Sequence, residues 1–316
     1  IMKKTYYFII IIMTTILFSC LNENNINPSE ELKSLSNTKT QKIDLDTLKN
    51  KTIAGIKGTK IEFERNKFEV ENGEKISLIL KEFYEFKELF FNNINTITAD
   101  NELLESSGVI YISFESNGKK LKLKEKEFLK VSFPNLKLNK NTLFSAKTDS
   151  LNQFEWTELK EKTAITENAR ILRNVGGGIT IEEIAIDTVG YNLGEFNKID
   201  SLNNSVFLRK FDWINIDKLT EVDENISFQV EIENNDFGIL TSYVIYQNRN
   251  SFVSNYHSNE ELKLSNIPII KNQTFLIVLG YKNNLFFASK TLLKNEKKLV
   301  MKLKEIDRKE LEKLIE

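Results

Sequence analysis

Cysteine and histidine are almost missing from this chain, which holds one of each, Cys20 and His257. A single cysteine cannot form a disulfide within the chain. Zinc usually takes about three or four His, Cys or carboxylate ligands, and these two residues cannot supply such a set. We therefore expect no structural disulfide, no metal and no cofactor.

A histidine-dependent hydrolase is disfavoured for the same reason. His257 would have to be the base of any Ser-His-Asp arrangement, yet the chain contains no Gly-x-Ser-x-Gly motif, where such a serine often lies. Tyr256, His257 and Ser258 lie in a polar stretch. This context predicts a solvated histidine in a loop.

The chain also lacks an excess of positive or negative charge. It has 44 Lys and Arg residues against 45 Asp and Glu residues, whereas a nucleic-acid-binding domain is normally strongly basic. With only three prolines, 41% hydrophobic residues and 10% aromatic residues, the composition is that of an ordered globular protein. We expect no nucleic-acid partner.

The first twenty residues have the pattern of an export signal. Lys3 and Lys4 precede an apolar run over residues 6–18, and Ser19-Cys20 ends it. The run is too short to span a bilayer, which needs about 20 residues. We therefore predict a signal peptide over residues 1–19, cleaved between Ser19 and Cys20.

Cys20, directly after a small residue at the end of this leader, resembles the lipid-acceptor cysteine of bacterial lipoproteins. Its thiol is expected to carry a palmitate-type lipid that anchors the chain in the cell envelope, at the outer membrane, with the leaflet left open. Residues 20–42 are mostly Asn, Ser, Glu, Lys and Thr. Such a segment buries too little apolar surface to offset its ordering entropy, which predicts a flexible tether.

The next hundred or so residues have the pattern of short strands. Polar and apolar residues alternate over 60–64, and residues 109–115 predict another strand. The pairs Asn72-Gly73 and Asn117-Gly118 suit tight hairpin turns, because Asn and Gly tolerate positive φ. Apolar residues at helical spacing over 86–94 predict one short helix packed over a sheet.

The C-terminal part shows the same strand pattern. Residues 274–281 are almost wholly apolar, which predicts a central strand buried on both faces. Lys282-Asn283-Asn284 predicts a turn to the next strand. Asp307, with Glu310 three residues later, predicts the start of a short terminal helix.

Together these patterns predict a mainly β protein with two antiparallel β-sandwich domains and a short C-terminal helix. The expected division is a signal peptide (1–19), a lipidated tether (20–42), a first β-sandwich (43–138), a mixed connecting segment (139–222) and a second β-sandwich with the helix (223–316).

Five segments carry a resemblance to a widespread family of uncharacterised lipoproteins of Gram-negative cell envelopes. They are Gly58-Thr59-Lys60-Ile61-Glu62-Phe63, Lys81-Glu82-Phe83-Tyr84, Leu104-Glu105-Ser106-Ser107-Gly108-Val109-Ile110-Tyr111, Asn117-Gly118-Lys119-Lys120-Leu121 and Asp212-Trp213-Ile214-Asn215-Ile216-Asp217. The family's usual Gly-Trp is Asp212-Trp213 here, and its usual cysteine is Ile216, which removes a thiol site and favours a packing role.

The resemblance implies a first domain similar to the sandwich shared by zonula-occludens proteins, netrin receptors and ankyrins. It implies a last domain similar to the regulatory sandwich of carboxypeptidases. Some netrin-receptor-like sandwiches cleave themselves at a His-Phe-Ser step. Here His257 is followed by Ser258-Asn259 in the other domain, so self-cleavage is not expected, and the family implies no other activity.

Paired carboxylates are a second source of chemistry, because glycosidase sites combine two Asp or Glu residues that are distant in sequence. An ordinary role as charged surface residues accounts for the same Asp and Glu residues equally well. The candidates are Glu102, Glu105, Glu182, Glu183, Asp187 and Asp217.

Two further segments lack a residue that a calcium-binding or a phosphate-binding loop requires. Asp149 and Asn152 lack the Gly at the sixth position of a calcium-binding loop. Gly176-Gly177-Gly178 lacks the Lys-Ser/Thr that would follow in a phosphate-binding loop.

Aromatic residues are the features most suggestive of binding, because an exposed ring can stack on a sugar. Core packing in strands accounts for them equally well. The candidates for a ligand-facing role are Trp156, Tyr243, Tyr246 and Tyr256, with Trp213 and Tyr281 as further examples.

These observations favour a non-catalytic, membrane-anchored binding or scaffolding module with an envelope protein or glycan as partner. The alternative is a carboxylate-dependent hydrolase acting on envelope or external glycans.

Overall fold

The computed structural model describes residues 26–45, 52–134, 141–148, 153–159, 170–175, 178–183, 198–200, 205–233, 236–258 and 262–316, the three ranges between 170 and 200 by their backbone only. Ser19, Cys20, Asp149, Asn152 and Asp187 lie outside these residues, as do Gly176 and Gly177. In the part of the chain described, no helix is both long enough and apolar enough to cross a bilayer.

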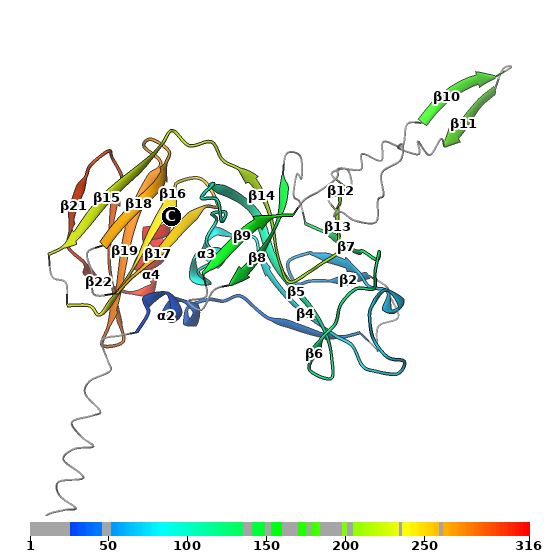
Figure 1. The fold of residues 1–316 in the computed structure, drawn as a ribbon, viewed down its shortest axis with the longest axis horizontal. Coiled ribbons are helices and arrows are strands. Elements are labelled where there is room, and N and C mark those ends of the chain that lie inside the picture. The colour runs from blue at the N-terminus through cyan, green and yellow to red at the C-terminus, as the bar shows by residue number, and fades with distance from the viewer. Residues whose placement is uncertain are drawn as a thin grey trace, which may run out of the picture.

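The first sandwich contains two sheets (Figure 1). The larger sheet has the order β1 (Gln41–Asp44), β4 (Ser77–Phe83), β5 (Leu104–Ser116), β14 (Trp213–Leu219), β8 (Thr142–Thr148) and β9 (Phe154–Glu158), with β6 (Lys119–Lys120) paired to β5. The smaller sheet has the order β12 (Lys198–Asp200), β13 (Ser205–Leu208), β7 (Leu129–Ser132), β3 (Lys60–Glu62) and β2 (Thr52–Ala54). A short 3-10 helix, η1 (Arg65–Lys67), follows β3, and β10 (Arg170–Val175) pairs with β11 (Gly178–Glu183).

The long strand β5 shows why this unit folds as layers. Its side chains alternate between two faces, and Ile110, Ile112 and Phe114 pack into the core between the two sheets. Val109, on the opposite face, packs into a different cluster, which it shares with the second sandwich. Strand β5 is therefore buried on both sides and lies at the centre of the molecule.

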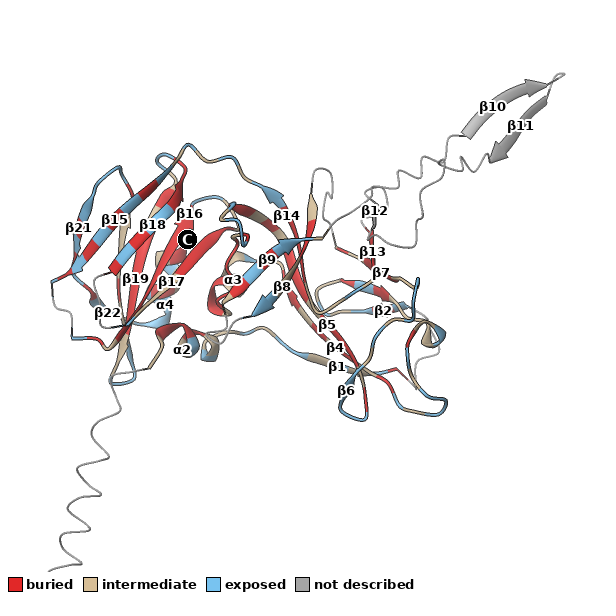
Figure 2. Ribbon diagram, in the orientation of Figure 1, coloured by how far each residue is buried: buried red, intermediate tan, exposed pale blue. Residues whose placement is uncertain are grey.

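The second sandwich is also built from two sheets, and it confirms the predicted fold class. One has the order β18 (Leu262–Ile269), β15 (Glu224–Ile232) and β21 (Lys298–Met301), the last pair being parallel. The other has the order β17 (Phe252–Ser258), β16 (Ile239–Tyr246), β19 (Thr274–Lys282), β20 (Leu285–Leu292) and β22 (Lys304–Ile306). Figure 2 shows buried residues along the whole of β16.

Several local predictions agree with the structure. The apolar segment 274–281 is the central strand β19, between β16 and β20. Asn117-Gly118 and Asn283-Asn284 form turns with positive φ at all four residues. The helix α4 (Arg308–Ile315) begins at Asp307, whose side chain accepts a hydrogen bond from the Glu310 N–H, while the Glu310 carboxylate accepts one from the Asp307 N–H.

The prediction of a hairpin at Asn72-Gly73 is wrong. The two residues do form a turn, and Gly73 has a φ of 85°. The strands on either side do not pair with each other, because β3 pairs with β2 and β7 while β4 pairs with β1 and β5. A turn sequence specifies the local backbone and not the strand partner.

The predicted connecting segment 139–222 differs most from the structure. Strands β8, β9 and β14 belong to the large sheet of the first sandwich, and β14 lies between β5 and β8 in that sheet. Strand β14 pairs with β5 about one hundred residues earlier in the chain, for example Ile214 with Ile110. Such a non-local partner leaves no mark in the local sequence pattern.

The predicted tether 20–42 is also partly folded. The helix α2 (Pro28–Ser34) begins at Asn27, whose side chain accepts a hydrogen bond from the Ser29 N–H. Leu32 is fully buried, and the helix contacts β16 and β19 of the second sandwich. Composition misses this helix because one leucine and one cap residue anchor a segment that is polar overall.

A buried carboxylate organises the β2–β3 hairpin. The Glu82 side chain is 2% exposed and accepts hydrogen bonds from the backbone N–H groups of Lys57 and Thr59, both at 3.0 Å, and from Gln41 Nε2 at 2.7 Å. The backbone of Gly55 passes so close that a Cβ there would lie 2.6 Å from the carboxyl group. The loop over residues 55–59 is thus folded around this one side chain.

Replacing Glu82 by alanine should lower the free energy of unfolding by about 3 kcal/mol, because it leaves buried donors without an acceptor. Urea unfolding measures the change. The matched control is Glu71→Ala, at an exposed glutamate, which should alter stability by less than about 0.5 kcal/mol. Equal effects of the two substitutions would contradict the role given to Glu82.

Candidate binding site

The two sandwiches are joined through Thr96, a buried residue in the loop before β5. Its N–H donates to the Phe252 carbonyl at 2.9 Å, and its Oγ1 accepts from the Phe252 N–H at 2.8 Å. A further backbone bond runs from the Ser106 N–H to the Asn250 carbonyl at 3.1 Å. These bonds fix the start of β17 against the first sandwich.

An aromatic cluster surrounds these bonds. The helix α3 (Phe86–Phe91), with a capping box between Glu85 and Glu88, lies between the two sandwiches (Figure 1). The ring of Phe90 lies 4.6 Å from that of Tyr243 and 5.7 Å from that of Phe252. The ring of Phe86 meets Phe252 edge-on at 6.0 Å. The junction is therefore a packed core and not a flexible linker.

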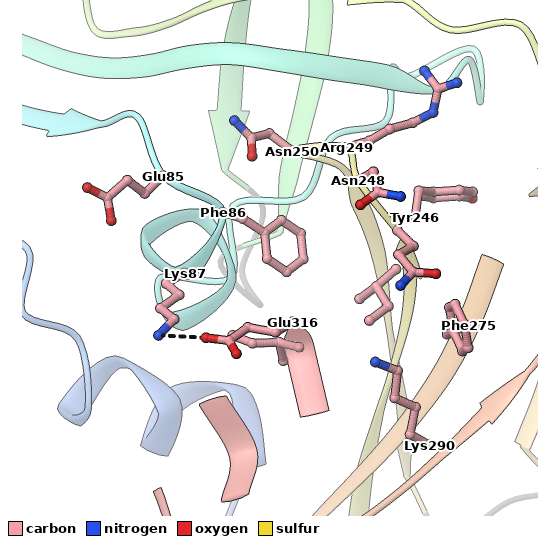
Figure 3. A pocket seen from close by; sticks show the side chains of 13 residues that line it. Glu85, Phe86, Lys87, Tyr246, Asn248, Arg249, Asn250, Phe275, Lys290 and Glu316 are labelled. Carbon is pink, nitrogen blue, oxygen red and sulfur yellow. Dashed lines mark ion pairs between the residues drawn. The ribbon is translucent and has the colours of Figure 1, made fainter. Parts of the chain in front are cut away.

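A pocket of about 340 Å³ opens beside this cluster (Figure 3). The side chain of Phe86 comes from α3, Phe275 from β19, Lys290 from β20 and Glu316 from the end of α4, while residues 247–250 form the turn between β16 and β17. The helix α3 between the sandwiches, the second sandwich and the end of α4 therefore form its walls.

Five of the described residues that line the pocket are charged: Glu85, Lys87, Arg249, Lys290 and Glu316. Lys87 pairs with Glu316 at 3.3 Å on one side. On the other side, Lys290 Nζ donates to the Leu314 carbonyl at 2.6 Å and lies 4.8 Å from the centre of the Phe275 ring. Burial lowers the pKa of Lys290. A desolvated ammonium of this kind favours an anionic group beside it.

Arg249 connects the pocket to a buried polar cluster. In Figure 3 its guanidinium points away from Lys290 and Glu316, and its Nη1 pairs with Glu105 Oε2 at 2.6 Å. Beyond Glu105 lies the fully buried Asp217, whose carboxylate accepts from Asn215 Nδ2 at 2.5 Å and from the Ser107 N–H at 3.3 Å. Burial raises the pKa of Asp217 to about 7, against the hydrogen bonds from Ser106, Asn215 and Ser107 that lower it.

The carboxylates predicted as candidates for catalysis are only partly brought together. Glu105 and Asp217 are close enough for the charge of Glu105 to raise the pKa of Asp217 further. Glu102 is exposed on the loop before β5. Glu182 and Glu183 belong to β11, where only the backbone is described. Among the described residues, no group of three or more His, Cys, Asp or Glu residues is arranged to hold a metal ion.

Three of the four aromatic residues predicted as ligand-facing lie in the core. Trp156 and Tyr243 are fully buried, and Tyr246 is 1% exposed. Trp156 Nε1 donates to the Asn95 carbonyl at 2.7 Å, and the Tyr246 hydroxyl donates to the Pro268 carbonyl at 2.9 Å. Their rings cannot stack on a ligand, so the core interpretation is correct for them, and Tyr256 is the one that remains partly exposed.

The prediction that His257 is a solvated residue in a loop is wrong. The residue lies in β17 opposite Leu240, half-buried, and not in a loop. Its Nε2 lies 2.9 Å from Ser242 Oγ, within hydrogen-bonding distance, and burial lowers its pKa to about 4. The neutral imidazole therefore serves as a hydrogen-bond partner of a buried serine inside the second sandwich.

Sequence reasoning missed Thr96 and Lys290. The helical spacing over residues 86–94 did locate α3, whose Phe86 lines the pocket. Thr96 bonds to a residue 156 positions later, and a separation of that size has no sequence signal.

A scan of protein-family models, a search of curated proteins and a search of solved structures each return no match to this chain.

The buried carboxyl of Asp217 predicts a pH-dependent stability. Its folded-state pKa of about 7 lies above the usual aspartate value of 3.8, so its contribution to stability is complete below pH ~4 and is lost as the pH rises through ~7. The difference in unfolding free energy between wild type and Asp217→Asn should shrink or reverse over this range. Urea unfolding at several pH values measures it.

Asp100→Asn is the control, because Asp100 is exposed. The same pH dependence in the Asp217→Asn protein as in the wild type would show that Asp217 is not the titrating group.

Proposed function

We propose that this chain is a lipid-anchored protein of the cell envelope that binds a partner without catalysing a reaction. The export signal, Cys20 and the family resemblance support the location. The observation that carries the binding role is the pocket between the sandwiches, because binding sites favour the junctions between domains. The partner is an envelope protein or glycan.

The lining of the pocket supports a partner group with an anionic and an apolar part. The rings of Phe86 and Phe275 supply apolar walls, and Lys290 supplies the cation. The Thr96 and Phe252 hydrogen bonds hold these walls in one arrangement. A pre-organised pocket of this kind loses little conformational entropy when a partner enters.

The alternative of a carboxylate-dependent hydrolase depends on Glu105 and Asp217. A general acid has to reach the bond that it protonates, but Asp217 is 0% exposed and Glu105 is held by Arg249. Paired carboxyls with one raised pKa also occur in structural networks. We therefore favour binding over hydrolysis.

A photo-crosslinking residue in place of Gln247, an exposed residue of the pocket rim, should give a specific adduct in intact cells that make the full chain. The same residue at the exposed position Lys302, away from the pocket, is the control. The adduct should fall about fivefold when Lys290→Glu is added, because reversing one charge removes the favourable pair and adds repulsion.

Adducts are identified by mass after gel separation. Equal adducts at positions 247 and 302, or an adduct at 247 that is insensitive to Lys290→Glu, would contradict binding in this pocket.

The anchor is tested separately. Radioactive palmitate should label the wild-type chain and should not label Cys20→Ala, because the thioether at this sulfur starts the lipid attachment. Label on the Cys20→Ala protein would contradict the proposed anchor.

A further inference from the structure

A second hollow lies on the first sandwich, away from the junction pocket. It is a groove of about 740 Å³, within the range of about 300–1,000 Å³ that is usual for small-molecule sites. Its walls come from residues 121–125, Leu159 and residues 209–211. We propose that this groove binds a single-chain anionic amphiphile, namely a fatty acid.

One wall of the groove is apolar. Leu121, Leu123, Leu159 and Phe211 line it, and all four are half-buried and pack against the core between the two sheets. The ring of Phe211 meets that of Phe114 at 5.2 Å. The wall is therefore supported from behind by the core, while part of its apolar surface still faces the groove. An acyl chain lying there would remove that surface from water.

The rim of the groove is cationic. Lys122, Lys124 and Lys210 are exposed and line it together with Arg209, and among the described residues that line the groove Glu125 is the one acidic residue. Arg209 lies over the ring of Phe128 at 5.6 Å. Four cations against one anion among the lining residues that the structure describes, in a chain whose overall charge is −1, make a local positive patch. Such a patch attracts a carboxylate head group.

The combination distinguishes a fatty acid from other anionic partners. A nucleic acid would use the cations but not the leucine wall. A flat membrane surface would meet the lysines, whereas the apolar residues lie within a groove. A fatty acid places its chain on the four apolar residues and its carboxylate among the lysines, so it uses both sets.

The test uses the full mature chain and a conjugated polyene fatty acid that fluoresces in apolar surroundings. The wild type should bind it, and the double variant K122E/K210E should bind about tenfold more weakly, because two favourable charges become repulsive. The matched control K302E reverses the charge of an exposed lysine of the second sandwich and should bind within about twofold of the wild type. Leu159→Ser should weaken binding without a change of charge.

Circular dichroism confirms that each variant is folded. The alcohol with the same chain should bind about tenfold more weakly than the acid. Unchanged binding by K122E/K210E, or equal binding of alcohol and acid, would overturn the proposal. Binding to vesicles of anionic phospholipid, with none to the free fatty acid, would also overturn it and assign these lysines to a membrane surface.

Discussion

The hydrogen bonds between Thr96 and Phe252 are the constraint on which the rest of the structure depends. The Thr96 hydroxyl donates to the Phe252 carbonyl and accepts from its N–H, so one buried side chain replaces a pair of strand bonds. Leaving these groups unpaired in the interior would cost about 1–3 kcal/mol each. The bonds also fix Phe252 where it meets Phe86 and Phe90, so the aromatic cluster of the junction follows from them.

The packing around α3 makes the two sandwiches one body. The cluster combines Leu32 of α2, Phe90 of α3, Val109 of β5 and Leu311 of α4. These four elements therefore share one hydrophobic core at the junction. A core of this kind is close-packed and does not deform gradually. The walls of the junction pocket are thus held in one arrangement by the packing of this core.

The sequence predicts the elements whose causes are local. The capping box at Asp307, the turn at Asn283-Asn284 and the buried strand β19 each depend on residues within one short window. The place of β14 between β5 and β8, the hydrogen bond of the buried Trp156 and the contacts of Lys290 depend on partners fifteen or more residues away in sequence. Residues 139–222 are predicted to form a mixed connecting segment, and the buried residues of β14 are consecutive and do not alternate, so neither this strand nor the identity of its partners has a clear local signal.

The pKa shifts of Asp217 and His257 have opposite effects on the pH dependence of stability. Burial keeps His257 neutral with a pKa of about 4, below the usual histidine value of 6.5, so its contribution to stability is complete above pH ~6.5 and is lost as the pH falls towards ~4. The contribution of Asp217 changes in the opposite direction between pH ~4 and ~7. Between pH ~4 and ~6.5 the two contributions have slopes of opposite sign, so each reduces the pH dependence that the other alone would give. Only single substitutions separate them, because each one removes one slope and reveals the other.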